Sequence, residues 1–336
     1  MTSQLELAHQ LEARGRIAEA TDIFRRSAGT GDGEALAALA KHLLIHRTNL
    51  AREGISAANA AVRAGSGEAA HLLAVFIAAG VGFKPDWQVA LNGLLHSAEL
   101  GWAPSQRELA LLAGAPATER NWRALRGKID VDAWIASPAA RELHSSPRIL
   151  AVDGFAPPQI CDWLVELARP HLRPAMTYDP ESGGTHYEPG RTNSACHLIL
   201  PYSDLVLALI RARMATATGV PAQFLEITTF LHYLPGQTFA PHHDYLDDSF
   251  PGYVKEIAQN GQRVLTFLLY LNDDFEGGET EFPLVEFRHK GRKGDALFFW
   301  NVQTDGSLDR QTLHAGLPPT IGEKWLLSQW VRNKPV

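Results

Sequence analysis

The spacing of hydrophobic and polar positions changes along the chain. The first third is rich in alanine and has a helical pattern, whereas short apolar runs bounded by Gly, Pro, Asn or Asp dominate the last third. Between them, residues 158–172 predict an amphipathic helix, and residues 203–219 predict a second helix that ends at Gly219. Four later segments predict strands: residues 224–234, 263–273, 295–300 and 324–332.

The alanine-rich third contains an internal repeat. The tripeptide Gly-Glu-Ala at residues 33–35 recurs at residues 67–69, and a weaker third copy begins at Leu100. A period of about 34 residues is typical of helix-turn-helix repeats of the tetratricopeptide or Sel1-like class. Because one such unit cannot bury its apolar face alone, we expect about three to stack. The sequence thus predicts a helical-repeat domain over residues 1–115, a linker over 116–146 and a second domain over 147–336.

Composition limits the function classes. The 336 residues carry a net charge of −6, with 45% hydrophobic and 20% charged residues, as in ordinary soluble proteins. Without a basic stripe the sequence predicts no nucleic-acid partner, and without a long apolar run it predicts no membrane span. The N-terminus lacks the apolar core of a signal peptide. The two cysteines, Cys161 and Cys196, form no disulfide framework, so we expect a cytoplasmic location.

His242, Asp244 and His314 have the spacing of a metal site. An H-x-D pair followed much later by a lone histidine is the sequence form of the triad that binds non-haem Fe(II) and leaves coordination positions open. On a strand, residues two apart share a face, so His242 and Asp244 could chelate one ion. The alternatives are a chance H-x-D pair and an ordinary core or surface histidine.

Lys324 opens the apolar strand predicted over residues 324–332. A lysine on the buried face of a strand is costly unless its charge is paired, and a ligand carboxylate could supply that partner. The alternative is that Lys324 faces solvent.

Five ordered segments carry a family resemblance: GRTNSACHLIL, HYLPGQTFAPHHDYLDD, RVLTFLLYLNDDFEGGETEFP, KGDALFFW and LHAGLPPTIGEKWLLSQWVR. Together they resemble the prolyl 4-hydroxylase family of Fe(II)/2-oxoglutarate oxygenases over residues 147–332. The resemblance implies an α+β chain, in which the helical repeats precede a double-stranded β-helix of the jelly-roll or cupin-like kind, buttressed by helices. It also implies Fe(II), 2-oxoglutarate and O2 as cofactor and co-substrates, and ascorbate as a reductant.

The same resemblance implies a role for each matching residue. His242, Asp244 and His314 would be the iron ligands. The pocket of 2-oxoglutarate would contain Lys324, Tyr270, Tyr233 and Thr280. The substrate mouth would be lined by Arg191, Arg263 and Trp330.

Two positions near the expected mouth depart from the family pattern. Phe239 stands where family members commonly have a tyrosine, and Arg332 stands where they commonly have a histidine. We therefore include both residues among the expected substrate contacts. A guanidinium is suited to a carboxylate, which a free amino acid has and a peptidyl proline lacks. The alternative is that Arg332 is a solvated C-terminal residue.

These features predict hydroxylation of an unactivated C–H bond in a proline-like ring. The favoured substrate is a free cyclic imino acid such as proline or pipecolate. One alternative is a peptidyl-prolyl 4-hydroxylase whose repeats dock a protein substrate. Another is a catalytically dead binding scaffold, against which the intact triad and Lys324 argue. We also expect lids over residues 178–190 and 245–262, and homo-oligomers could form through the repeats.

Overall fold

The computed structural model describes residues 3–81, 84–179, 181 and 184–336. The chain divides into two compact units. The helical unit comprises residues 1–133 and 199–209, and the β unit comprises residues 134–198 and 210–336. This division differs from the expected one, because residues 116–133 include a helix, α8, that packs on α6 and α7 instead of forming a linker.

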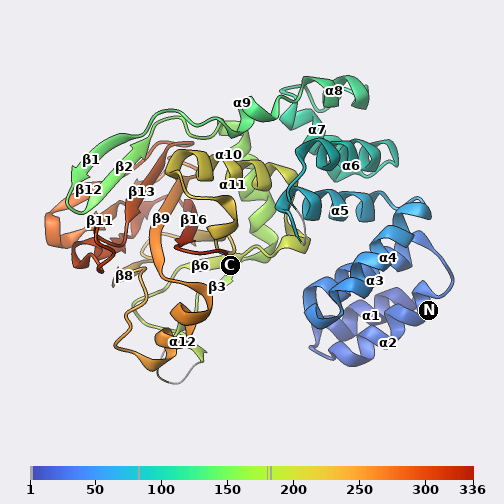
Figure 1. The fold of residues 1–336 in the computed structure, drawn as a ribbon, viewed down its shortest axis with the longest axis horizontal. Coiled ribbons are helices and arrows are strands. Elements are labelled where there is room, and N and C mark those ends of the chain that lie inside the picture. Colours follow the sequence, from blue (N-terminus) through green and yellow to red (C-terminus); the bar gives the residue numbers. More distant parts are fainter. Residues whose placement is uncertain (1–2, 82–83, 180, 182–183) are drawn as a thin grey trace. The chain divides into compact units, whose positions relative to one another are not determined.

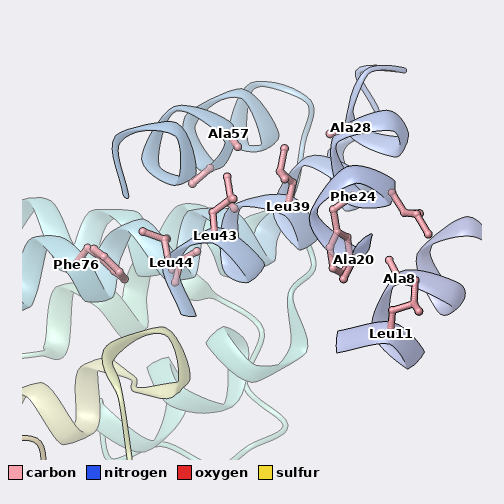
Figure 2. Packing of buried hydrophobic residues seen from close by; sticks show 14 residues of the cluster. Ala8, Leu11, Ala20, Phe24, Ala28, Leu39, Leu43, Leu44, Ala57 and Phe76 are labelled. Atoms are coloured by element: carbon pink, nitrogen blue, oxygen red, sulfur yellow. The ribbon is translucent and has the colours of Figure 1, made fainter. Parts of the chain in front are cut away.

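The helical unit is a succession of helices (Figure 1). Its buried face consists largely of alanine and leucine, with Phe24 and Phe76 as the large side chains (Figure 2). The elements are α1 (Gln4–Ala13), α2 (Ile17–Ala28), α3 (Gly33–His46), η1 (Thr48–Leu50), α4 (Ala51–Arg63), α5 (Gly67–Ala79), α6 (Trp87–Glu99), α7 (Ala103–Leu112), α8 (Trp122–Lys128) and α9 (Val131–Ile135).

The sequence repeat coincides with the starts of α3, α5 and α7. A Cβ added at Gly33 would lie 3.1 Å from the carbonyl oxygen of Ala64, and one at Gly67 would lie 2.7 Å from Cβ of Trp102. The repeated glycine therefore allows the beginning of one helix to approach the residues just before the next helix of the repeat, α5 or α7. The predicted helices are confirmed, while their assignment to the tetratricopeptide or Sel1-like class stays a prediction.

The β unit contains an eight-stranded antiparallel sheet, called the major sheet below. Its order is β1-β2-β13-β9-β16-β7-β6-β3. All four predicted strand segments lie in it, with shorter bounds for three of them. The strands are β1 (Arg141–Ser145), β2 (Arg148–Val152), β3 (Arg173–Pro174), β6 (Ser194–His197), β7 (Thr229–Tyr233), β9 (Arg263–Tyr270), β13 (Ala296–Trp300) and β16 (Lys324–Arg332).

A four-stranded sheet, called the minor sheet below, has the order β12-β11-β14-β8. Its strands are β8 (Phe239–His242), β11 (Thr280–Phe282), β12 (Phe287–His289) and β14 (His314–Gly316). Two further pairs are β4 (Thr177–Tyr178) with β5 (Thr185–His186) and β10 (Glu276–Gly277) with β15 (Pro319–Ile321). The helical N-terminal region followed by antiparallel sheets is consistent with the expected double-stranded β-helix.

Helices accompany these sheets. Both predicted helices form, as α10 (Pro158–Ala168) and α11 (Leu205–Thr218), and α12 (Pro251–Asn260) lies in a segment expected to be a lid. Arg211 of α11 donates hydrogen bonds to Gln329 and Thr228. Because side chains alternate along a strand, Gln329 lies on the opposite face of β16 from Ser328, and α11 covers that outer face. In the described ranges, we find no helix with both the length and the apolarity needed to cross a membrane.

Candidate active site

A cavity of about 470 Å³, counted with its mouth, is lined by residues of both sheets of the β unit. Along β16 every second residue faces it, from Lys324 through Leu326 and Ser328 to Trp330. This period of two is the one that a strand imposes. The remaining lining residues are Arg191, Thr229, Leu231, Tyr233, Phe239, His242, Asp244, Leu268, Thr280, His314, Ala315 and Gly316.

His242 and His314 come from neighbouring strands of the minor sheet and are register partners. Nδ1 of His242 lies 2.8 Å from the carbonyl oxygen of Ala240, and Nδ1 of His314 lies 3.0 Å from that of Thr312. Since a carbonyl oxygen can only accept, both Nδ1 atoms carry the proton. Each neutral ring therefore presents the lone pair of Nε2, the form that binds a metal.

Asp244 supplies the carboxylate of the triad. Its Oδ1 lies 3.5 Å from Nε2 of His242, and its Oδ2 lies 3.4 Å from Nε2 of His314. Although burial alone would raise the pKa of Asp244, the neighbouring His314 and His242 imidazoles and the Thr266 hydroxyl lower it overall. The carboxylate is therefore the stable form. The expectation of a strand position needs correction, because β8 ends at His242 and Asp244 lies in the following turn.

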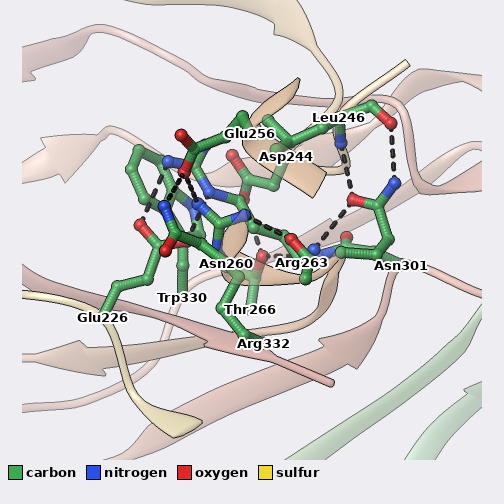
Figure 3. A network of polar contacts seen from close by, with 12 residues as sticks. Glu226, Asp244, Leu246, Glu256, Asn260, Arg263, Thr266, Asn301, Trp330 and Arg332 are labelled. Atoms are coloured by element: carbon green, nitrogen blue, oxygen red, sulfur yellow. Dashed lines mark hydrogen bonds and ion pairs between the residues drawn. The ribbon is translucent and has the colours of Figure 1, made fainter. Parts of the chain in front are cut away.

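A hydrogen-bonded relay orients this carboxylate (Figure 3). The Thr266 hydroxyl donates to Oδ2 of Asp244 at 2.7 Å, and the amide of buried Asn301 donates to that hydroxyl at 3.0 Å. Sequence reasoning missed Thr266 and Asn301. A threonine facing inward on apolar β9 was the available signal, but its partner could not be identified without the fold.

The donor set fits the implied metal. One ligand atom from each of His242, Asp244 and His314 lies within 4.8 Å of the others. Two imidazole nitrogens and one carboxylate are the ligands of non-haem Fe(II) sites that keep positions open. The structure thus brings together all three residues that the sequence predicted as iron ligands.

Lys324 is fully buried, and its Nζ has no hydrogen-bond partner within the described part of the chain. Burial lowers the pKa of this ammonium to about 7. Nζ lies 5.1 Å from the centre of the Tyr233 ring, and Lys324 and Tyr233 are register partners on β16 and β7. An orphaned cation in a cavity is suited to an anionic ligand, as the distal carboxylate of 2-oxoglutarate would be.

The other residues expected near 2-oxoglutarate are also placed. Thr280 and Tyr233 line the cavity, whereas Tyr270 is buried behind it. The hydroxyls of Tyr270 and Thr280 lie 3.0 Å apart, and burial raises the pKa of Tyr270 to about 12. Tyr270 therefore stays neutral and is positioned to orient the Thr280 hydroxyl.

Phe239, Arg191 and Trp330 all line the cavity. The Phe239 ring stacks on His242 with centroids 3.6 Å apart, and the Arg191 guanidinium carbon lies 4.3 Å from the Phe239 centroid. Arg263 is absent from this lining, because its guanidinium stacks on the Trp330 ring at 3.5 Å and pairs with Glu226. Arg263 thus supports Trp330 from behind.

The expectation for Arg332 needs correction. This residue is buried outside the cavity lining and donates to Glu226, to the carbonyl oxygen of Gly261 and to Glu256 (Figure 3). With three acceptors already around it, the guanidinium is not available to a substrate carboxylate. It instead links β16 to the end of α12. Sequence reasoning missed Glu226, because a glutamate between apolar positions does not reveal two arginine partners.

The expected lids are described in part. Residues 180, 182 and 183 of the first segment lie outside the described residues. In the second, α12 occupies residues 251–260, and its Tyr253 ring lies 5.9 Å from that of Tyr178. The two segments therefore meet at an aromatic contact.

Known proteins resemble the β unit. A sequence model of the 2OG-Fe(II) oxygenase superfamily matches residues 228–332. Prolyl 4-hydroxylase 1 of Arabidopsis thaliana is 36% identical over 203 residues, covering 56% of this chain and 70% of that protein. Probable prolyl 4-hydroxylase 3 of the same plant is 35% identical over 208 residues, with the same coverage of 56% and 70%.

Among solved structures, the viral collagen prolyl hydroxylase of Paramecium Bursaria Chlorella virus-1, in its 2OG complex, is 27% identical. The match covers 55% of this chain and 95% of that one, with a TM-score of 0.42. The sequence matches, together with the residues gathered in the cavity, lead to one conclusion. The chain belongs to the prolyl 4-hydroxylase-like family of 2OG-Fe(II) oxygenases and is a hydroxylase that uses Fe(II) and 2-oxoglutarate.

Proposed function

We propose that the protein hydroxylates a proline-like ring and that its substrate is a free cyclic imino acid of the proline or pipecolate type. The Arg191 guanidinium carries this proposal. Its Nε is buried and has no hydrogen-bond partner among the residues described, and burial lowers the pKa of the group. A substrate carboxylate would supply both the missing acceptor and the missing counter-charge.

Arg191 lies near the metal ligands, as the binding of a small substrate by its carboxylate requires. The Phe239 ring contacts both the Arg191 guanidinium and the His242 imidazole. In a cyclic imino acid, the carboxylate and the ring carbons are a few bonds apart. A carboxylate held by Arg191 would therefore keep the ring close to the metal ligands, which is the positioning that catalysis requires.

The remaining wall supports the same chemistry. Leu231, Leu268 and Leu326 give the cavity an apolar surface that excludes water around a reacting C–H bond. Lys324 would hold the distal carboxylate of 2-oxoglutarate, with Thr280 as a further polar contact. Bound Fe(II), held by the triad, supplies the activation of O2, and the protein side chains bind and orient.

A peptidyl proline is the second candidate. The curated relatives are named prolyl 4-hydroxylases, and the Arg332 guanidinium that favoured a free carboxylate is engaged elsewhere. In this case Arg191 would donate to a peptide carbonyl oxygen, and the helical unit could dock the polypeptide. The dead scaffold is disfavoured by the family and by the unpaired Lys324.

Matched substrates separate the two candidates. Succinate formation is measured with L-proline and L-pipecolate, and with the same rings capped as N-acetyl methylamides. The proposal predicts turnover of a free acid and a large rise in its KM in Arg191→Ala, with Arg173→Ala on exposed β3 as the control. Turnover of capped rings alone, with Arg191→Ala affecting them little, would reject the free imino acid.

A further inference from the structure

Two histidines and one glutamate of the helical unit lie close together, with one ligand atom from each of Glu12, His42 and His46 within 4.8 Å of the others, and His9 lies beside Glu12. His9 and Glu12 lie on α1, and His42 and His46 lie on α3. Oε1 of Glu12 is 2.7 Å from Nδ1 of His42 and 3.1 Å from Nε2 of His46, and its Oε2 is 3.3 Å from Nδ1 of His9. We call these four residues the helical His–Glu cluster.

Helical spacing and packing build this cluster. Residues three or four apart share one helix face, so His9 lies beside Glu12 and His42 beside His46. Phe24 of α2 lies against both helices, with its ring centroid 5.0 Å from that of His9 and 4.7 Å from that of His42. Figure 2 shows Phe24 in the same apolar core as Leu11 and Leu43, the chain neighbours of Glu12 and His42.

The hydrogen bonds of His42 indicate which of its ring nitrogens faces Glu12 as an acceptor. The Thr21 hydroxyl lies 2.8 Å from the carbonyl oxygen of Ile17 and donates to it, because a carbonyl oxygen can only accept; the same hydroxyl lies 2.8 Å from Nε2 of His42. Thr21 therefore accepts from Nε2–H of His42. In neutral His42 the lone pair of Nδ1 then faces the Glu12 carboxylate. Either a proton or a metal ion must lie there.

We propose that the helical His–Glu cluster binds a divalent metal ion of the zinc class. His42, His46 and Glu12 would be its three protein ligands. Ligand atoms around tetrahedral zinc lie about 3.3 Å apart, since each bond is about 2.0–2.1 Å. The 3.1 Å between Glu12 and His46 is close to this value, and the 2.7 Å between Glu12 and His42 would open by about half an ångström. Thr21 would act as the outer partner that fixes the tautomer of a metal-binding histidine.

Such an ion would have a structural role in the helical unit. It would cross-link α1 to α3 across α2, because Glu12 lies on α1 and both His42 and His46 lie on α3. The site is independent of the cavity, because none of its residues lines it. A helical unit stabilised in this way would unfold at a higher temperature when the metal is present.

The test is a metal titration of the full chain. The reference protein, called the background below, is the double variant His242→Ala, His314→Ala, which cannot bind metal in the cavity. Zn²⁺ or spectroscopically visible Co²⁺ is added to it. We expect one equivalent to bind. His46→Ala should weaken binding by more than about a hundredfold, and Thr21→Val by about 10- to 100-fold. His96→Ala, an exposed histidine of α6, is the matched control and should bind as the background does.

Two results would overturn the proposal. One is a background chain that binds no Zn²⁺ or Co²⁺. The other is equal affinity in His46→Ala and His96→Ala, which would show that a proton occupies the cluster. If the background does not fold, the same count is made in the otherwise unchanged chain. We expect two equivalents of metal there and one in His46→Ala, and two in both would also reject the site.

Discussion

His242 and His314 face each other as register partners on β8 and β14, with ring centroids 4.3 Å apart. The hydrogen-bonded ladder between the strands fixes this separation, and the carbonyl oxygens of Ala240 and Thr312 fix the ring tautomers. The backbone thus prepares two ligands before a metal binds. Asp244, in the turn after β8, completes the set.

Replacing any of these ligands should abolish turnover. His242→Ala, Asp244→Ala and His314→Ala each remove a donor from a three-ligand site, so Fe(II) binding and 2-oxoglutarate turnover should both be lost while circular dichroism stays unchanged. His243→Ala is the matched control, because this adjacent histidine contacts the carbonyl oxygen of Arg310 instead. Substantial turnover in one ligand variant would show that its residue does not bind iron.

The relay behind Asp244 should set the affinity for iron. Thr266→Val keeps the shape of the side chain but removes the hydrogen bond to the carboxylate, and outer partners of this kind contribute about 10- to 100-fold in metal affinity. The measurement is an anaerobic Fe(II) titration. Thr216→Val, on the exposed side of α11, should change nothing. An affinity in Thr266→Val equal to that of the control would contradict the relay.

Lys324 should lower the stability of the ligand-free protein while strengthening its binding of 2-oxoglutarate. An unpaired buried cation destabilises the ligand-free protein, so Lys324→Met should raise the melting temperature in the absence of 2-oxoglutarate. The same change should weaken 2-oxoglutarate binding by about a hundredfold or more, since leaving one partner of a buried pair unmatched costs about 3–5 kcal/mol. Lys255→Met on exposed α12 is the control. Unchanged 2-oxoglutarate affinity in Lys324→Met would refute the assignment.

Arg332 should matter for stability more than for substrate recognition. Arg332→Ala leaves Glu226 without one of its two arginine partners and frees α12 from β16. We expect a loss of about 3 kcal/mol in the free energy of unfolding, at the lower end for buried pairs because Glu256 is partly exposed. Arg288→Ala, which breaks the exposed pair with Glu281, should cost less than about 1 kcal/mol. Denaturant unfolding measures both, and equal losses would contradict this role.

The sequence predicted the parts of the site that depend on spacing and period. The resemblance implied Lys324 for the 2-oxoglutarate pocket, and the structure places it on the cavity wall; the strand segments around it were found because they are apolar and clearly bounded. The H-x-D pair identified two ligands, although Asp244 reaches the site from a turn.

Contacts between distant segments could not be predicted. Arg332 was expected to contact substrate because it stands where family members commonly have a histidine, but its partners Glu226 and Glu256 approach from other elements. Asn301 and Thr266 meet only because β13 pairs with β9. The helical His–Glu cluster was missed for the same reason, since α1 and α3 are brought together by α2.

The central claim is that the protein hydroxylates a proline-like ring with O2 and 2-oxoglutarate, and the most direct test measures where the oxygen atoms of O2 go. The full chain is incubated with Fe(II), 2-oxoglutarate, isotopically heavy O2 and L-proline or L-pipecolate, and both products are analysed by mass spectrometry. The account predicts equal amounts of succinate and hydroxylated ring, each carrying one heavy oxygen atom, and neither product in His314→Ala. Succinate formed at the same rate without any ring substrate, with no heavy oxygen in free or capped rings, would contradict it.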